Sequence, residues 1–310
     1  MINTKTPHPP TTIFIIDFLL SCVGVLLGVA FFTLIERKII GLAHFRKGPT
    51  KVVAHGLSQP IGDAIKLLTK ERTKITSLKI GMYLTGPLLR ITLIIICWSI
   101  YDYAFLSLST RIKVVVLFSL IGLASYRILL IRWGSNRKYA TLGGHRAIAQ
   151  VISYEVCIFL FFLAIAYPIK TINTLTIHTI RQGLWVAVFS LPLLLAWILL
   201  CIAESNRTPF DIAEGESEIV SGFNIEYGGG LFALIFIREY GIIIILRFLT
   251  ASLFLGGRNF LIIKTFLICF IYVWVRVSAP RVRYDKLITT SWKVILPYRL
   301  TIILIGIIII

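Results

Sequence analysis

Residues 231–249 read LFALIFIREYGIIIILRFL, a mostly apolar run that only Arg238, Glu239 and Arg247 interrupt with charge. An α-helix rises about 1.5 Å per residue, so a run of this length extends for about 28 Å, close to the thickness of a bilayer's hydrocarbon core. The run lacks the apolar–polar alternation of a barrel strand, and lipid offers no water to an unpaired backbone. The stretch therefore predicts a membrane-spanning α-helix.

Seven further apolar stretches have a similar length and character. They cover residues 13–35, 80–101, 114–131, 147–167, 184–203, 260–277 and 294–310. With 57% hydrophobic residues, 15% charged residues and a mean hydropathy of +0.88, the composition lies outside the soluble range. No internal repeat or low-complexity linker divides the chain. We predict an all-α membrane protein with about eight transmembrane helices, forming a single integral membrane domain over residues 1–310.

The charges predict an orientation in the membrane. The chain carries 32 Lys and Arg against 14 Asp and Glu, a formal net charge of +18. Most basic residues outside the predicted spans lie in the segments that follow the first, third, fifth and seventh spans. The positive-inside bias then predicts inner basic loops and both termini on the outer side. Because no soluble segment carries a basic patch with interleaved aromatic residues, we expect anionic lipid rather than nucleic acid as the partner.

Motifs for several other functions are missing from the sequence. The five cysteines lie singly in five predicted spans, and the five histidines are widely separated. This pattern predicts no disulfide framework, no metal site and no iron–sulfur cluster held by this chain. Without a P-loop, a nucleophile elbow or an HExxH motif, a freestanding ATPase or hydrolase is not expected. The N-terminus lacks the features of a signal peptide, so we expect the first span to stay in the mature protein.

Two inner segments are longer than a tight connection needs. In the first, residues 56–71 (GLSQPIGDAIKLLTKE) place apolar side chains on one helical face, and Pro60 suits a first turn. The apolar face consists of Leu57, Ile61, Ala64, Ile65 and Leu68, and the polar face of Asp63, Lys66 and Lys70. We predict an interfacial amphipathic helix on the inner side; packing on another subunit remains an equal alternative. In the second segment, residues 133–150, we expect Gly134, Gly143 and Gly144 to mark turns.

A third inner segment concentrates negative charge. Residues 203–227 read AESNRTPFDIAEGESEIVSGFNIEY and hold six of the chain's 14 acidic residues. Thr208, Pro209 and Asp211 resemble a helix start, with Thr208 as the cap and Pro209 at the first position. From there Asp211, Glu214 and Glu218 fall at i, i+3 and i+7, so the three carboxylates share one helical face, while Glu216 points elsewhere.

Three glutamates lie within or at the ends of predicted spans: Glu155, Glu239 and Glu204, the last of which is also the first acidic residue of the third inner segment. A charged residue at the bilayer centre costs at least about 2.5 kcal/mol, so these side chains should face the bundle interior or a wet cavity. Together with the acidic segment they predict a proton-exchanging path entered from the inner side, with coupled titration. The alternative is a solvated acidic loop with capping roles and one intramembrane glutamate paired with an arginine.

The acidic segment resembles the signature of the chain 1 family of respiratory complex I, the proton-pumping NADH:ubiquinone oxidoreductase. Five other blocks of that family occur in the same order, so the resemblance extends over essentially the whole chain. They are LIERKIIG (34–41), FRKGPT (45–50), GLSQPIGDAIKLLTKE (56–71), AIAQVISYEV (147–156) and PRVRYDKLITTSWK (280–293).

The resemblance implies a ubiquinone access chamber where the membrane arm meets the hydrophilic arm. The implied chamber residues are Glu36, Arg37, Arg46, Asp63, Arg207, Phe232, Arg281 and Arg283. It also implies that ubiquinone is the substrate, that this chain binds no cofactor, and that iron–sulfur clusters and FMN lie in partner subunits. The implied partners are the hydrophilic-arm subunits of the quinone site and the antiporter-like membrane subunits.

The resemblance also implies an acidic funnel toward the antiporter-like subunits, which coincides with the predicted proton path. The path residues are Glu155, Glu204, Asp211, Glu214, Glu216, Glu218, Glu226 and Glu239. Arg238 and Arg127 depart from the family pattern, which has uncharged residues there, and each adds positive charge to a span. Neighbouring helical positions do not face each other, so Arg238 need not pair with Glu239.

Three alternatives remain open at this point. A proton-coupled secondary transporter would predict inverted repeats or paired broken helices, which are not seen in the sequence. The equivalent subunit of a membrane-bound hydrogenase would share the fold, and a purely structural anchor would leave the carboxylates without a role. The Ile-rich chain without a presequence is typical of an organelle-encoded protein, so we expect the mitochondrial inner membrane, with the bacterial plasma membrane as the alternative. Cardiolipin is then the expected anionic lipid.

Overall fold

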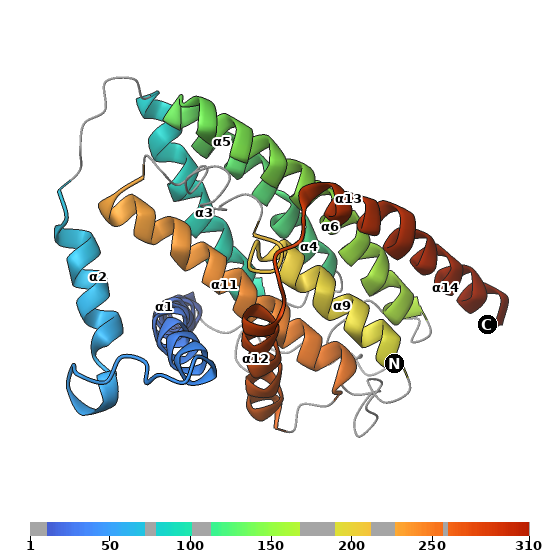
Figure 1. Ribbon diagram of the computed structural model, residues 1–310, viewed down its shortest axis with the longest axis horizontal. Coiled ribbons are helices and arrows are strands. Elements are labelled where there is room, and N and C mark those ends of the chain that lie inside the picture. Colours follow the sequence, from blue (N-terminus) through green and yellow to red (C-terminus); the bar gives the residue numbers. More distant parts are fainter. Residues whose placement is uncertain are drawn as a thin grey trace.

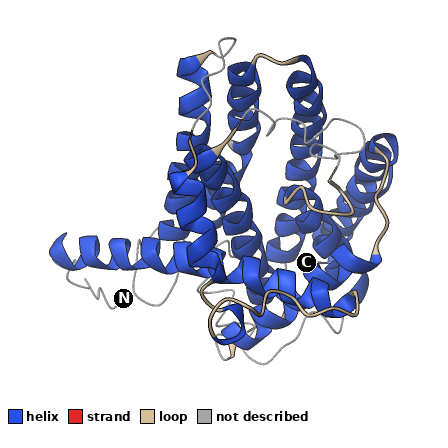
Figure 2. Cartoon of the chain, turned by 60° about the vertical axis from the view of Figure 1, so that its left-hand side comes forward, coloured by secondary structure: helices blue, strands red, loops and turns tan. Residues whose placement is uncertain are grey.

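The computed structural model describes residues 11–71, 79–100, 113–167, 190–211, 227–256 and 260–309. Across these residues the chain is helical and contains no strand (Figures 1 and 2). Seven helical segments of the described chain are long and apolar enough to cross a membrane, and residues 191–204 form a shorter apolar helix. The predicted all-α membrane fold is therefore confirmed.

Figure 1 labels most of the helices. In chain order the described elements are α1 (Thr11–Ala43), η1 (Ala54–Gly56), α2 (Gln59–Thr69), α3 (Ile80–Ile100), α4 (Lys113–Gly122), α5 (Ala124–Ser135), α6 (Lys138–Ala166), α9 (Leu191–Glu204), α11 (Gly229–Phe254), α12 (Leu261–Ser278), α13 (Tyr284–Thr290), η4 (Ser291–Ile295) and α14 (Leu296–Ile309).

Helix α11 is central to the arrangement, because it contacts α1, α2, α3, α9 and α12. Helix α1 is seen almost end-on in Figure 1, whereas α5, α6 and α11 run across the view, so α1 crosses the other helices steeply. Helix α2 stands at the edge of the molecule, beyond α1 and away from α5 and α6 (Figure 1). Helix α2 therefore packs against α1 and α11, at a distance from α5 and α6.

The main core forms where α6, α9 and α11 meet. Trp197 is fully buried there, with its ring near those of Phe161 and Phe254. Its indole Nε1 donates a hydrogen bond of 2.9 Å to Thr250 Oγ1, so the polar atom of this large side chain has a partner. Aromatic packing of this kind holds the short helix α9 in place, and α9 ends at Glu204.

Two predicted span boundaries were wrong. Helix α1 continues to Ala43, eight residues past the predicted end at residue 35, and α6 begins at Lys138 rather than at residue 147. Both helices continue past the apolar run, because charged and polar residues can be part of a helix where it lies outside the lipid core. As a result Glu36 and Arg37 lie on a helix and not in a loop.

The turns expected at Gly134, Gly143 and Gly144 were also wrong, since all three residues lie within helices α5 and α6. Gly134 instead allows a close helix contact: a Cβ there would lie 2.7 Å from the Tyr83 backbone nitrogen of α3. Gly86 on α3 plays the same role from the other side, where a Cβ would lie 2.6 Å from Ile131 Cγ1. Small residues permit such close approach between helices in lipid.

The amphipathic helix predicted in the first inner segment is confirmed as α2, with Pro60 in its first turn. Its apolar residues Ile61, Ile65 and Leu68 are 57–73% exposed in the isolated chain. A partner surface, either lipid or another subunit, is expected to cover this face, and the two alternatives raised by the sequence both remain open.

The helix start predicted at Thr208–Asp211 was wrong for the described residues, which form a turn there. The Phe210 N–H donates to the Arg207 carbonyl at 2.8 Å, and the Val282 N–H donates to the Pro209 carbonyl at 3.0 Å. Tertiary contacts thus stabilise a compact turn in place of a helical cap. The expected helical face continues into residues 212–226, which lie outside the described residues, as do Glu214, Glu216, Glu218 and Glu226.

Candidate functional site

An ion pair joins the C-terminal part of α1 to the C-terminal end of α12. Glu36, which is 8% exposed in its side chain, pairs through Oε1 with Nη1 of Arg276. Glu36 lies on α1 because that helix continues past its apolar run, and Arg276 lies in the last turn of α12. The sequence prediction included Glu36 but missed Arg276, although an arginine at the end of an apolar span is a recognisable signal.

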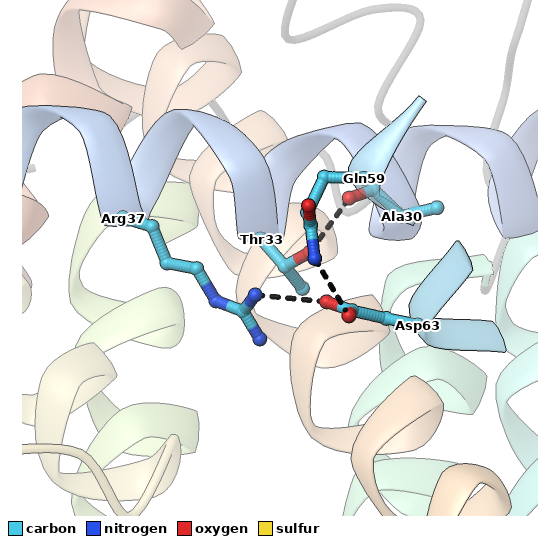
Figure 3. Close-up of polar contacts among 5 residues, drawn as sticks. All are labelled: Ala30, Thr33, Arg37, Gln59 and Asp63. Carbon is cyan, nitrogen blue, oxygen red and sulfur yellow. Dashed lines mark hydrogen bonds and ion pairs between the residues drawn. The ribbon is translucent and has the colours of Figure 1, made fainter. Parts of the chain in front are cut away.

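A second polar contact joins α1 to α2 (Figure 3). Arg37 Nη1 donates to Asp63 Oδ2 at 2.8 Å, and Gln59 Nε2 donates to Asp63 Oδ1 at 3.0 Å. The Arg37 and Asp63 side chains are 55% and 36% exposed, so their attraction contributes only about 0–1 kcal/mol to stability. The contact therefore serves to place α2 against α1 rather than to stabilise the fold.

Arg207 approaches the same region from the turn that follows α9. Its guanidinium carbon lies 4.4 Å from the centroid of the Tyr240 ring on α11. Tyr240 in turn packs edge-on against Phe32, with ring centroids 5.8 Å apart, and Phe32 precedes Glu36 by one turn of α1. Glu36, Arg37, Asp63 and Arg207 are thus brought to one polar site between the C-terminal ends of α1 and α12, helix α2 and the middle of α11.

An apolar cavity of about 580 Å³ lies between α1, α3, α11 and α12. Along α1 its lining begins at Leu20 and reaches Ile35, the residue before Glu36. Fifteen residues of helix correspond to about 22 Å, so the cavity is elongated and approaches the polar site. Most lining side chains are apolar, and Arg247 also borders the space. The resemblance implied an access chamber, but the sequence could not place this cavity.

Other predicted chamber residues lie apart from these contacts. Arg46 and Arg281 are exposed, and Arg283 forms an exposed ion pair with Asp285 at 3.0 Å. Phe232 packs against Phe236 near the start of α11, with ring centroids 4.4 Å apart. These residues remain predicted members of the chamber.

Two predicted path glutamates are deeply buried. Glu204, the last residue of α9, is 1% exposed, and neither carboxyl oxygen has a hydrogen-bond partner among the described residues. Glu239 on α11 pairs through Oε1 with Arg90 Nη1 of α3 at 3.3 Å, and both side chains are buried. This pair is the intramembrane glutamate–arginine contact that the alternative interpretation anticipated, and it involves Arg90 rather than the neighbouring Arg238.

Glu155 lies half-buried on α6 and faces the break between α4 and α5. A Cβ at Gly122 would lie 1.8 Å from Glu155 Oε1, so glycine is the residue type that leaves room for this carboxyl group. Glu155, Arg127 and Arg238 all act electrostatically on Glu204. The charges of these four residues therefore influence one another within the bundle.

Asp211 lies outside the membrane-spanning segments, at the end of the turn after α9. Burial raises the pKa of its carboxyl group above the ordinary range, while the guanidinium groups of Arg281 and Arg207 oppose that rise. A carboxyl group whose pKa is higher in the folded than in the unfolded protein lowers stability when it is charged. That cost is fully present above the raised pKa and is relieved as the pH falls toward the ordinary value.

We expect Asp211→Asn to remove part of the pH dependence of stability. The substitution should raise the temperature of thermal dissociation of the solubilised complex above the raised pKa of Asp211, and leave it unchanged at acidic pH. Asp285→Asn, which neutralises an exposed carboxylate, is the matched control and should show no such gain. An Asp211→Asn gain that is the same at every pH would contradict the raised pKa.

Comparison with known proteins identifies the family. The sequence model of the family described as NADH dehydrogenase matches residues 16–307. NADH-ubiquinone oxidoreductase chain 1 of Aedes aegypti is 43% identical over 294 residues, covering 92% of this chain and 94% of the relative. The proteins of the same name from Balaenoptera physalus and Osphranter rufus are 43% and 41% identical, over 93% and 94% of this chain and 93% and 95% of the relatives.

These matches confirm the resemblance inferred from the sequence blocks, and they extend over nearly the whole length of both partners. Together with the apolar helices, they exclude the secondary transporter considered above. This chain belongs to the NADH dehydrogenase family, as a membrane subunit of NADH-ubiquinone oxidoreductase.

Proposed function

We propose that this chain forms much of the ubiquinone access chamber of its complex and carries an acidic path that couples quinone reduction to proton translocation. The observation that carries the proposal is the elongated apolar cavity along α1, which approaches the polar site of Glu36, Arg37, Asp63 and Arg207. An apolar passage next to a charged site suits a molecule with a long isoprenoid tail and a polar headgroup.

The polar site supplies the electrostatics that quinone reduction requires. Reduction of ubiquinone to ubiquinol takes up two electrons and two protons, and negative charge develops on the headgroup oxygens before protonation is complete. The guanidinium groups of Arg37, Arg207 and Arg276 can stabilise that charge from fixed positions. In this proposal the electrons come from an iron–sulfur cluster in a partner subunit, supplied in turn through FMN in another, and the antiporter-like subunits are further partners.

The acidic path is supported by the burial of its described members. Glu204 is too deeply buried to belong to a solvated acidic loop, and Asp211 binds its proton more tightly than an exposed aspartate. Charge that develops in the chamber changes the proton affinity of nearby carboxylates, which then titrate as a coupled set. Glu155, Glu204, Asp211 and Glu239 form the described part of this path, and Glu214, Glu216, Glu218 and Glu226 its continuation.

The proposed location is the mitochondrial inner membrane, with the basic loops in the matrix, and a bacterial plasma membrane is the alternative. The orientation rests on the basic loops between the apolar helices, and both α2 and the polar site belong to the inner side on that basis. Anionic lipid such as cardiolipin would bind at those basic loops.

Photolabelling with a ubiquinone-like probe in native membranes tests the chamber. We expect the label on peptides of α1, α2 and α11, and we expect a short-chain quinone to compete with it. Label confined to other subunits, with no competition on this chain, would overturn the proposal.

We expect Asp63→Asn to weaken quinone use with little loss of stability. The variant loses the charge that holds Arg37 but keeps most of the helix contacts, so stability should fall by no more than about 1 kcal/mol. The KM for short-chain quinone should rise severalfold while assembly is retained, as measured by quinone reductase kinetics in membranes. Glu71→Gln, which removes a negative charge from an exposed site just after α2, is the control and should leave KM unchanged. If both variants raised the KM equally, the effect of Asp63 would come from its charge alone and not from its contact with Arg37.

A further inference from the structure

Gln150 is a buried polar residue to which the proposed function assigns no role. It lies on α6, within an apolar span, and its side chain is fully buried. Its Nε2 donates two hydrogen bonds, one to the carbonyl oxygen of Ala203 and one to that of Phe210, each 3.0 Å long. Both partners are acceptors, so the amide nitrogen and not its oxygen must face them.

The two carbonyl groups mark the two ends of the turn that follows α9. Ala203 immediately precedes Glu204, Phe210 immediately precedes Asp211, and Arg207 lies between them. The amide group of Gln150 therefore connects two points of the segment that holds Glu204, Arg207 and Asp211. Using both of its N–H groups, it sets the separation of the two backbone points from which Glu204 and Asp211 extend.

Tyr154, one turn further along α6, supports the same turn. Its ring packs against Phe210 with centroids 6.3 Å apart, and its hydroxyl group donates to the Leu287 carbonyl of α13 at 3.0 Å. Because the aromatic contact is not directional, it does not prevent the turn from rotating or sliding. The two hydrogen bonds of Gln150 supply the directional part of the attachment.

We propose that Gln150 is a positioning residue for the acidic path, holding Glu204 and Asp211 in register through the carbonyl groups of Ala203 and Phe210. The inference rests on the proposed function, because it assigns Gln150 a role in proton coupling through residues of the proposed path. It adds a residue on a different helix that itself neither titrates nor contacts the quinone site. A shift of about 1 Å in such a constellation can lower a rate by about a hundredfold.

Two substitutions of similar length separate the hydrogen bonds from the packing. Gln150→Met keeps the volume and has no donor at any pH. In Gln150→Glu the charged form presents only acceptors to the two carbonyl groups, whereas the protonated form can donate one hydrogen bond. Quinone reductase turnover and proton pumping are measured per assembled complex, normalised to reduction of a water-soluble acceptor that does not use the quinone site.

We expect Gln150→Met to lower quinone reductase turnover by at least about tenfold at all pH values, within the range that misplacement of reacting groups causes. Gln150→Glu should show the same loss at alkaline pH and partial recovery relative to the unchanged chain as the pH falls, whereas the turnover of Gln150→Met relative to the unchanged chain should stay constant. If Gln150→Met does not assemble, Gln150→His, which can donate one bond through its ring, should give intermediate turnover.

Turnover and pH profiles like those of the unchanged chain, in all variants that assemble, would overturn the inference. Equal losses in Gln150→Met and Gln150→Glu across the whole pH range would also overturn it, because the loss would then not follow the donor. Glu204→Gln tests the proposed path separately: normal turnover in Glu204→Gln would count against the path, whereas the two results above, beside an impaired Glu204→Gln, would count against Gln150 alone.

Discussion

Glu204→Gln is expected to lower quinone reductase activity and the associated proton pumping by at least about tenfold. The figure is a lower bound, because a positioned proton-transferring group typically contributes more than about tenfold to a rate. The substitution keeps the size of a side chain that is 1% exposed, and it removes only the capacity to bind and release a proton. Because neither carboxyl oxygen has a hydrogen-bond partner among the described residues, an amide breaks no described contact. The measurements are quinone reduction and acidification of the outer space in sealed vesicles.

Glu239→Gln is the comparison, since Glu239 also belongs to the proposed path but pairs with Arg90. That variant leaves a buried guanidinium without its carboxylate, which typically costs about 3–5 kcal/mol, so its assembly should suffer more than that of Glu204→Gln. Reduction of a water-soluble acceptor reports assembled complex in both cases. Normal pumping by both variants would overturn the acidic path.

Arg299→Met is expected to stabilise the complex by up to about 2.5 kcal/mol, the cost of placing an arginine at the bilayer centre. Arg299 on α14 is fully buried, and its three guanidinium nitrogens have no hydrogen-bond partner among the described residues. Its guanidinium group lies against the Phe161 ring of α6, a contact that offsets part of the desolvation cost. Methionine keeps much of the volume and removes the charge, so thermal dissociation of the solubilised complex should occur at a higher temperature.

Two comparisons make this result specific. Arg299→Ser removes the same charge but leaves a space, so it should stabilise less than Arg299→Met, by the cost of the cavity. Arg299→Lys keeps the charge and should bring no gain. A lower dissociation temperature for Arg299→Met than for the unchanged chain would show that the charge contributes favourably to packing.

The spans were predictable from the sequence because hydropathy acts on the chain locally. Lipid requires backbone hydrogen bonds within each segment, so a run such as residues 231–249 specifies its own helix without reference to the rest of the protein. The spacing of apolar residues also predicted α2, because these residues recur on one helical face after Pro60. Boundaries failed where helices continue beyond lipid, as α1 does to Ala43, because hydropathy no longer distinguishes helix from loop there.

The candidate site was predictable as a set of residues but not as a set of contacts. Glu36, Arg37, Asp63 and Arg207 came from the resemblance to a family, whereas the pairing of Glu36 with Arg276 joins residues 240 positions apart. Gly134 and Gly144 were misinterpreted as turn residues, since a missing side chain suits a turn and a close helix contact equally. Local sequence cannot distinguish these uses, because the neighbour that needs the space lies on another helix.

The sequence by itself determined that this chain is a helical membrane protein, which family it resembles, and which acidic residues are costly enough to require a role. Only the tertiary structure decided that Glu239 pairs with Arg90, that Glu204 is buried without a described partner, and that Gln150 bridges the carbonyl groups of Ala203 and Phe210. The physical reason is range: hydropathy and helix formation act within a few residues of the chain, whereas ion pairs and buried hydrogen bonds depend on which helices meet.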